Sequence, residues 1–185
     1  MIEQIPSVCL FCGSRNGSKP EFRNAAMRFG SLVAAEDWRL VYGAGDVGLM
    51  GAAAQAAISA GGTVYGVMPR HLFEMEVARN DLDTLIITDT MHERKMNMFE
   101  NSDAIVALPG GLGTLDEFFE VLTWRQLGLH SKPLLLLNID HYWDGLFRLM
   151  NDIIESGFAD EDIREVYRVV TSPEAVIREL RNLLS

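Results

Sequence analysis

The sequence predicts an α/β fold of the Rossmann-like, doubly wound type, in which a mostly parallel sheet of about seven strands carries helices on both faces. Short apolar runs alternate with longer segments of helical period along the whole chain, and this order requires parallel strands joined by helices. The apolar runs are also continuous rather than alternating, as expected of strands that are buried on both faces. The composition is that of a globular protein, with 48% hydrophobic and 23% charged residues.

The expected strands are the apolar runs themselves, and the expected helices are the periodic segments between them. We place the strands at residues 7–11, 39–42, 63–67, 84–87, 104–108, 134–137 and 166–170. We place the helices at residues 20–36, 48–60, 91–101, 114–127, 143–156 and 173–184. Gly61 and Gly62 end one helix, and Ser172 with Pro173 starts the last. No linker or internal repeat divides the chain, so we expect one domain over residues 1–185.

Charge and hydropathy exclude several classes of partner. Sixteen Lys and Arg against twenty-six Asp and Glu give a net charge of −10, which repels nucleic-acid phosphates. No apolar run approaches the roughly 20 residues that cross a bilayer, and residues 1–18 lack a signal-peptide pattern. We therefore expect a cytoplasmic protein that binds neither nucleic acid nor membrane. Cys9 and Cys12 have the spacing of a redox motif, but they lie in an expected strand, so we interpret them as core residues.

In a sheet of this kind, ligands bind in the loops that follow the carboxyl ends of the strands. The loop at residues 43–48 matches the dinucleotide fingerprint G-x-G-x-x-G and opens an expected helix. A dinucleotide site also needs an acidic residue about 20 residues further on, where this chain has Met68 and Pro69. The motif therefore favours a mononucleotide or sugar phosphate over the cofactor of a dinucleotide-dependent oxidoreductase. A glycine turn that only lets the helix pack on the strand is the alternative.

The second glycine loop, Pro109-Gly110-Gly111-Leu112-Gly113-Thr114, leads into an expected helix that carries Asp116 and Glu117. Free amides and the helix dipole favour an anion such as phosphate at this helix start. Thr114 and Glu117 also fit a capping box, in which Glu117 would only bond to the backbone of its own helix start. That alternative explains neither the three glycines nor the second acid, Asp116.

A phosphate beside Glu117 would repel that carboxylate, so a shared site requires a nearby cation. The expected helix that precedes this loop provides two. On that helix Met91, Arg94 and Lys95 share one stripe with Met98, on a face that otherwise should look inward. The alternative is that both long side chains extend from a half-buried helix to solvent. The four histidines are scattered without metal-ligand spacing, so we expect no metal site. We expect no cofactor either.

Together these residues resemble the Lonely Guy (LOG) family of cytokinin riboside 5′-monophosphate phosphoribohydrolases. The matching signatures are Tyr42-Gly43-Ala44-Gly45 with Gly48-Leu49-Met50-Gly51, Met91-His92-Glu93-Arg94-Lys95, the Pro-Gly-Gly-x-Gly-Thr-x-x-Glu loop at 109–117, and Thr123-Trp124-Arg125-Gln126-Leu127-Gly128. The resemblance extends over nearly the whole chain. The chain departs from the family's common pattern at Ala44 and His141, where glycine is usual, at Arg15, where serine is usual, and at Arg125, where alanine is usual.

The resemblance implies a Rossmann-like homodimer with the active site near the subunit interface. It implies that Arg94 and Glu117 are the catalytic pair, that Lys95 and the loop at 110–114 bind phosphate, and that Glu76 contributes to the base and ribose pocket. The expected substrate-binding residues are, in chain order, Ser14, Gly45, Glu76, Met91, Lys95, Gly110, Gly111, Leu112, Gly113 and Thr114.

The expected reaction is hydrolysis of the N-glycosidic bond of a purine nucleoside 5′-monophosphate, N6-modified purines included, to the free base and ribose 5-phosphate. Glu117 would stabilise an oxocarbenium-like transition state or deprotonate the attacking water. Arg94 would hold the phosphate, orient Glu117 and keep that carboxylate ionised. One alternative is a non-catalytic carrier or sensor of a phosphorylated ligand such as the molybdenum cofactor, and another is a general nucleoside 5′-monophosphate nucleosidase in nucleotide salvage.

Proteins of this kind are often labelled lysine decarboxylases, and the lysines argue against that label. A pyridoxal enzyme needs a lysine that forms a Schiff base with the cofactor. The chain has only Lys19, Lys95 and Lys132, and none of them lies in a convincing cofactor loop.

Overall fold

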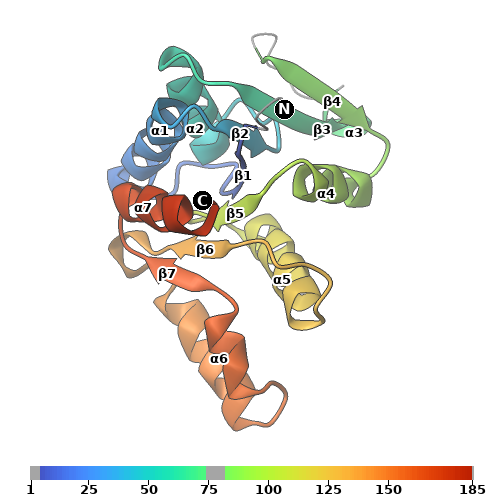
Figure 1. Ribbon diagram of the computed structural model, residues 1–185, viewed down its shortest axis with the longest axis vertical. Helices are drawn as coiled ribbons and strands as arrows, with labels where there is room; N and C mark the ends of the chain where they lie inside the picture. Colours follow the sequence, from blue (N-terminus) through green and yellow to red (C-terminus); the bar gives the residue numbers. More distant parts are fainter. Residues whose placement is uncertain (1–4, 74–81, 185) are drawn as a thin grey trace.

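The computed structural model describes residues 5–73 and 82–184. Seven strands form one sheet in the order β4-β3-β2-β1-β5-β6-β7 (Figure 1), and every neighbouring pair is parallel. The strands are β1 (Ser7–Phe11), β2 (Arg39–Tyr42), β3 (Val64–Pro69), β4 (Thr84–Thr88), β5 (Ala104–Ala107), β6 (Leu134–Leu137) and β7 (Arg168–Val170). The helices are α1 (Pro20–Ala35), α2 (Gly48–Ser59), α3 (Arg70–Phe73), α4 (Met91–Glu100), α5 (Leu112–Gln126), α6 (Asp144–Glu155) and α7 (Pro173–Leu184), with the 3₁₀ turns η1 (Ile139–His141) and η2 (Glu161–Glu165). The predicted fold class is confirmed.

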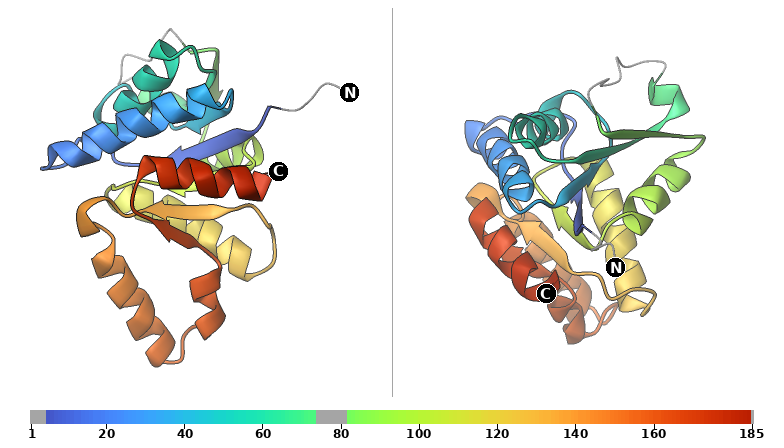
Figure 2. Two further views of the ribbon diagram at one scale, coloured as in Figure 1. Left: turned by 60° about the vertical axis from the view of Figure 1, so that its left-hand side comes forward. Right: turned by 45° about the horizontal axis from the view of Figure 1, so that its top comes forward.

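The sheet is covered on both faces. Helices α1, α2 and α7 pack on one face against alternate β1 residues such as Val8 and Leu10. Helices α4, α5 and α6 pack on the other face against Cys9 and Phe11. Figure 2 shows these two helix layers with the strands between them. Successive side chains of a strand point to opposite faces, so a central strand with helices on both sides is expected to be mainly apolar. In β1 the four residues Val8 to Phe11 are apolar, and only the first, Ser7, is polar.

Several element boundaries differ from the prediction. β3 continues to Pro69 because its pairing with β4 extends to Thr88. α5 begins at Leu112, two residues earlier than expected. β7 begins at Arg168 rather than at residue 166, since the preceding residues form η2 and its exit turn. The short elements α3, η1 and η2 were not predicted, because three to five residues are too few to show a helical period.

Helices α1 and α2 approach each other closely at a glycine. A Cβ on Gly30 would lie 2.1 Å from the carbonyl oxygen of Ala53, so only glycine allows this separation of the two helix backbones. α2 begins at Gly48, the last residue of the loop at residues 43–48. The close packing of α1 on α2 therefore fixes the end of that loop that joins α2.

The direction of strand addition changes at β1. Strands β2 to β4 lie on one side of β1, and β5 to β7 lie on the other. The loops after β1 and β5 diverge at this point, which is where open α/β sheets bind ligands. The backbone N–H of Gly13 donates to the carbonyl oxygen of Pro109 at 3.0 Å, so the two loops are joined at their base.

Candidate active site

A cavity of about 780 Å³ opens beyond the carboxyl end of β1, where the direction of strand addition changes. We call this place the switch point. Its walls come from the loops after β1, β2 and β5, from the segment after β6, and from residues of β3 and of the helices α1 to α5. The predicted site residues that line it are Ser14, Gly45, Arg94, Gly110, Gly111, Leu112, Gly113, Thr114 and Glu117. Most of the site expected from the sequence therefore converges in one place.

Arg94 is the buried cation of this cavity. The N-cap residue of α4 is Thr90, whose side chain accepts a hydrogen bond from the N–H of Glu93 at 3.1 Å. The Glu93 carboxylate accepts from the N–H of Asp89 at 2.9 Å. These reciprocal caps fix the first turn of α4. They place the Arg94 side chain on the inner face, where the residue is only 7% exposed. The alternative of side chains extending to solvent is wrong for Arg94.

The Arg94 guanidinium binds three acceptors. Nε donates to the carbonyl oxygen of Val67 at 3.2 Å, Nη2 donates to that of Gly43 at 3.2 Å, and Nη1 donates to Oε1 of Glu117 at 3.1 Å. The two carbonyls belong to the carboxyl ends of β3 and β2. A Cβ at Gly43 would lie 1.6 Å from Nη2, so the first glycine of the 43–48 motif gives the guanidinium room against the backbone.

Glu117 is the buried acid of the cavity, with 8% of its surface exposed. Burial raises the pKa of Glu117 to about 7, although the nearby Arg94 acts in the opposite direction and Asp116 adds to the increase. The expectation that Arg94 keeps this carboxylate ionised is therefore met only in part, because desolvation outweighs the attraction of the guanidinium. Near neutral pH, Glu117 can both accept and donate a proton.

The start of α5 differs from a capping box. Gly111 is the N-cap residue, so Thr114 and Glu117 both lie inside the helix. The Glu117 carboxylate contacts Arg94 instead of its own helix start. The first amides of a helix have no acceptor within it, and here they border the cavity through residues 110–114. The capping alternative is wrong, and the anion-binding interpretation stays a prediction.

Lys95 is also buried, at 7% exposure, so the solvent-exposed alternative is wrong for this residue too. Its ammonium contacts Asp116 at 3.0 Å and Glu120 at 3.1 Å, both on α5. Lys95 does not line the cavity. Its expected contact with phosphate stays a prediction, and the structure instead shows it joining α4 to α5.

Two other expected residues are not among the described residues that line this cavity. Met91 is 39% exposed and does not line it. Glu76 lies outside the described residues. For both, substrate contact stays a prediction.

Sequence reasoning missed the aromatic and apolar part of the wall. Phe22, Met50, Met68, Leu72 and Tyr142 line the cavity as well. Tyr142 could have been proposed from the sequence, because it follows the expected strand at residues 134–137 and so lies at the same edge of the sheet as the glycine loops. The others belong to segments with the pattern of ordinary core residues.

Cys9 and Cys12 are free and buried, as predicted. Burial raises the pKa of each thiol well above its usual range, which is the opposite of what a reactive cysteine needs. Within residues 5–73 and 82–184, no cluster of three or more His, Cys, Asp or Glu side chains is arranged to hold a metal ion. None of the helices in the same ranges is long and apolar enough to cross a membrane.

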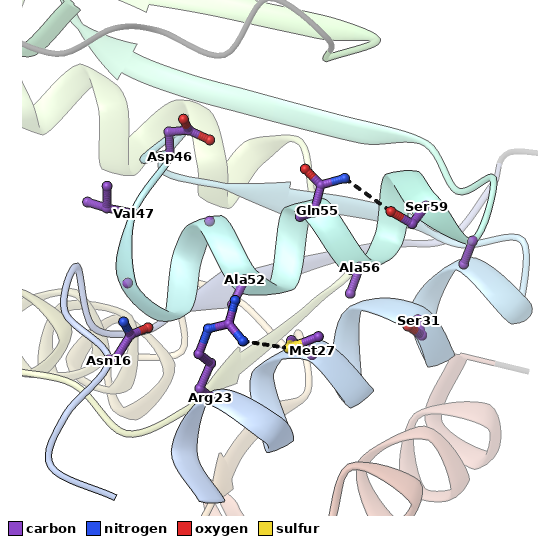
Figure 3. Close-up of a pocket in the computed structure, with 13 residues that line it drawn as sticks. Asn16, Arg23, Met27, Ser31, Asp46, Val47, Ala52, Gln55, Ala56 and Ser59 are labelled. Carbon is purple, nitrogen blue, oxygen red and sulfur yellow. Dashed lines mark hydrogen bonds between the residues drawn. The ribbon is translucent and has the colours of Figure 1, made fainter. Parts of the chain in front are cut away.

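A second hollow of about 640 Å³ lies over α1 and α2 (Figure 3). Arg23 contacts the sulfur of Met27 there at 3.2 Å, and Gln55 donates to Ser59 at 3.0 Å. Neither Arg94 nor the glycine loop at 110–114 belongs to this hollow, so the candidate site is the cavity at the switch point.

Comparison with known proteins agrees with the geometry. The cytokinin riboside 5′-monophosphate phosphoribohydrolase LOG2 of Arabidopsis thaliana is 39% identical over 91% of this chain and 78% of its own length. The probable cytokinin riboside 5′-monophosphate phosphoribohydrolase LOGL9 of Oryza sativa subsp. japonica is 44% identical over 91% of this chain and 73% of its own. The chain belongs to the LOG family.

A family profile described as "possible lysine decarboxylase" matches residues 50–180 of this LOG-family chain. The lysines do not suit that description. Lys19 pairs with Asp140, and Lys95 pairs with Asp116 on α5. Lys132 donates to the carbonyl oxygens of Phe99 and Ser102. None of the three lines the cavity.

The LOG-family chain also shares its fold with a molybdenum-cofactor-binding protein. That protein, from Rippkaea orientalis, has a TM-score of 0.76 and 25% identity and covers 99% of both chains. The molybdenum cofactor carrier protein of Chlamydomonas reinhardtii has a TM-score of 0.74 at 22% identity, covering 98% of both chains, and this likeness concerns the fold alone.

Proposed function

We propose that this chain hydrolyses the N-glycosidic bond of purine nucleoside 5′-monophosphates, N6-modified purines included, and releases the free base and ribose 5-phosphate. The observation that carries the proposal is the contact of Arg94 with Glu117 at 3.1 Å, buried in a cavity that the glycine loop also lines. The relatives in rice and Arabidopsis are named for the same reaction class.

Glu117 is the proton acceptor in this proposal. In its ionised form it removes a proton from water, the water oxygen bonds to C1′ of the ribose, and the bond from C1′ to the base nitrogen breaks with its electrons leaving on the base. With a pKa of about 7, Glu117 can then return the proton to the departing base. Arg94 remains charged throughout, and it fixes the direction of the carboxylate while opposing the charge of a bound phosphate.

The start of α5 is the proposed phosphate site. Residues 110–114 offer backbone amides at the positive end of a helix dipole. A phosphate held there orients the ribose, and its binding energy can be used at the reacting carbon. Ser14 and Gly45 belong to the same cavity wall, and we assign them to substrate binding. We retain Glu76, Met91 and Lys95 as proposed substrate contacts in the assembled enzyme.

The test is a panel of nucleotides incubated with the purified protein. Adenosine 5′-monophosphate, N6-modified derivatives of it, and adenosine are supplied separately, and released bases are identified by mass spectrometry. We expect base release from the monophosphates, much slower release from adenosine, and none with Glu117→Gln. Equal turnover of nucleoside and nucleotide would contradict the role of the phosphate.

The same panel addresses the alternatives. Similar rates for modified and unmodified monophosphates would indicate a general nucleosidase in nucleotide salvage. Nucleotide that stays intact through long incubation would favour a carrier, which the structural likeness to the molybdenum-cofactor-binding protein makes the second candidate.

We also propose that the active form is a cytoplasmic homodimer with the cavity near the interface. Leu112 lies on the cavity wall and is 86% exposed, and an apolar side chain of this kind is suited to cover by a second copy. A reducing compartment suits the free thiols of Cys9 and Cys12. Light scattering on wild type and Leu112→Ser tests the assembly, and an unchanged monomer mass for both would refute it.

A further inference from the structure

Tyr142 reaches the first glycine of the loop before α5 from a distant part of the chain. It follows η1, after β6, and its hydroxyl donates a hydrogen bond to the carbonyl oxygen of Gly110, 32 residues away. Its ring packs edge-to-face on Phe22, with centroids 5.4 Å apart, and on Trp143, with centroids 4.8 Å apart. Tyr142 also lines the cavity, with 41% of its surface exposed.

The hydrogen bond determines which way one peptide group points. The carbonyl of Gly110 and the N–H of Gly111 belong to the same peptide, and they point in opposite directions because the peptide is trans. Gly111 is the N-cap residue of α5, so its N–H is one of the amides at the helix start that an anion would use. The tyrosine hydroxyl keeps the carbonyl of Gly110 on the side of Tyr142. The N–H of Gly111 therefore points to the opposite side of the peptide.

A Gly-Gly peptide needs such an external contact. Glycine adopts left-handed and right-handed conformations with similar ease, so the peptide between Gly110 and Gly111 has little intrinsic preference for one orientation. Gly111 has open space around its Cα, and a Cβ there would meet nothing within 4 Å. Packing therefore does not fix the peptide on the Gly111 side, whereas Gly110 is closely packed, since a Cβ there would lie 2.0 Å from Oγ1 of Thr114 and 2.9 Å from the backbone nitrogen of Gly13. The tyrosine hydrogen bond adds the contact that acts directly on the Gly110 carbonyl.

The segment that carries Tyr142 is itself held in an unfavourable backbone conformation. Asp140 and His141 have φ angles of 49° and 61°, in the left-handed region that is unfavourable for residues with a Cβ. The contacts that maintain them include the ion pair of Lys19 with Asp140. The side chain of Asn138 adds a bond, in which its Oδ1 accepts from the N–H of Trp143 at 2.7 Å. The fold thus maintains a strained turn immediately before Tyr142.

We propose that Tyr142 is a positioning residue for the phosphate site, acting through the Gly110–Gly111 peptide. The proposal rests on the proposed function and deepens it. It assigns Tyr142 to the recognition of the phosphate group, which is shared by nucleoside monophosphates and ribose 5-phosphate, and not to the chemistry at the glycosidic bond.

The experiment compares Tyr142→Phe with wild type in two assays. Titration calorimetry with inorganic phosphate and with ribose 5-phosphate measures anion binding without turnover. Steady-state kinetics with adenosine 5′-monophosphate and with adenosine separates KM from kcat. We expect the variant to bind both phosphates about tenfold more weakly, which is the loss of one hydrogen bond's contribution. KM for the nucleotide should rise by a similar factor with kcat nearly unchanged, and the values for adenosine should not change.

Tyr65→Phe is the matched control. It also removes one tyrosine hydroxyl, which donates to Asn97 at 3.0 Å outside the cavity wall, and it should leave phosphate affinity unchanged. Phenylalanine at residue 142 keeps the aromatic contacts, and thermal unfolding checks that each variant folds.

Several outcomes would overturn the assignment of Tyr142. One is unchanged phosphate affinity in Tyr142→Phe, and another is a wild-type protein that binds no phosphate. Equal losses for nucleotide and nucleoside would also do so, because they would indicate contact with the nucleoside itself. If wild type binds phosphate but cleaves no nucleotide, the proposed hydrolysis fails while the phosphate titration still decides the role of Tyr142.

Discussion

Replacing Glu117 by Gln should change how the stability of this protein depends on pH. Burial of the carboxyl raises the pKa of Glu117 from 4.5 to about 7, so the folded chain binds this proton more tightly than the unfolded chain. An acid whose pKa is raised by folding lowers the free energy of unfolding when it ionises. This loss of stability is absent below the pKa of the unfolded chain, grows between the two pKa values, and is complete above the pKa of the folded chain. Glutamine has the shape of the protonated side chain and does not ionise.

The size of the effect follows from the two pKa values. The cost of ionising Glu117 in the folded chain is about 1 kcal/mol at pH 5.5 and about 3 kcal/mol at pH 8.5. The free energy of unfolding of wild type, minus that of Glu117→Gln, should therefore fall by about 2 kcal/mol across this range. Any fixed penalty from Arg94 facing an amide is the same at every pH and cancels in the slope. The whole range lies above the isoelectric point of about 4.8, so the chain keeps its net negative charge.

Urea unfolding of both proteins at intervals between these pH values measures the difference. Protein concentration is kept fixed, so that any subunit association contributes equally. In parallel, kcat/KM of wild type should rise with pH through about 7 as Glu117 ionises, while the variant stays inactive. A difference in unfolding free energy that is flat with pH, or that rises with pH, would refute burial as the dominant influence on the Glu117 carboxyl.

Three further substitutions test the contacts of Arg94 and Lys95. Arg94→Lys should lower kcat/KM by at least about 100-fold, because a single ammonium nitrogen cannot reproduce the spacing of the three guanidinium nitrogens that bind the two backbone carbonyls and Glu117; wild-type kinetics would refute this. Gly43→Ala should destabilise the protein by about 1–3 kcal/mol and inactivate it, since the new Cβ displaces the guanidinium, whereas Gly145→Ala, in an open helix position, should leave activity intact in the same melting and rate assays. Lys95→Met should raise the apparent pKa of the activity profile, because Lys95 lowers the pKa of Glu117; a higher KM with an unshifted profile would instead indicate that Lys95 contacts phosphate.

The strands were predictable because burial on both faces leaves a local mark in the sequence. The central strand β1 is buried at every position, and its continuous apolar run, lying between helical segments, is typical of a strand inside a parallel sheet. The predicted limits of β1, β2 and β6 agree with the structure. The 3₁₀ turns and α3 could not be predicted in the same way, since they depend on local hydrogen bonds and not on a repeating face.

The candidate site was predictable where glycine spacing and charge coincide with strand ends. Arg94 and Glu117 converge as expected, because each lies on a helix that begins at the carboxyl edge of the sheet, α4 after β4 and α5 after β5. The contact of Tyr142 with Gly110 was missed, because no local pattern connects residues so far apart. The pKa of Glu117 was also missed, since desolvation depends on the whole surrounding structure.

Two departures from the usual family pattern occur where the backbone has a positive φ angle. Ala44 and His141, where the family commonly has glycine, have φ angles of 58° and 61°. Glycine adopts this region without strain, and other residues do so only when their surroundings compensate. The sequence alone marks these positions as unusual, but only the backbone shows that each keeps the conformation that a glycine would favour.

The incomplete compensation of Glu117 is what makes the pair chemically useful. Arg94 supplies the positive charge of the pair, but two of its acceptors are neutral carbonyls fixed by β2 and β3. Only one contact is left for the carboxylate, and burial therefore outweighs attraction. A fully compensated carboxylate would have a low pKa and little affinity for a proton, whereas an uncompensated one would stay protonated. A proton acceptor works best when its pKa lies near the working pH, and the pKa of about 7 that burial and Arg94 together give Glu117 suits the role that we propose for it.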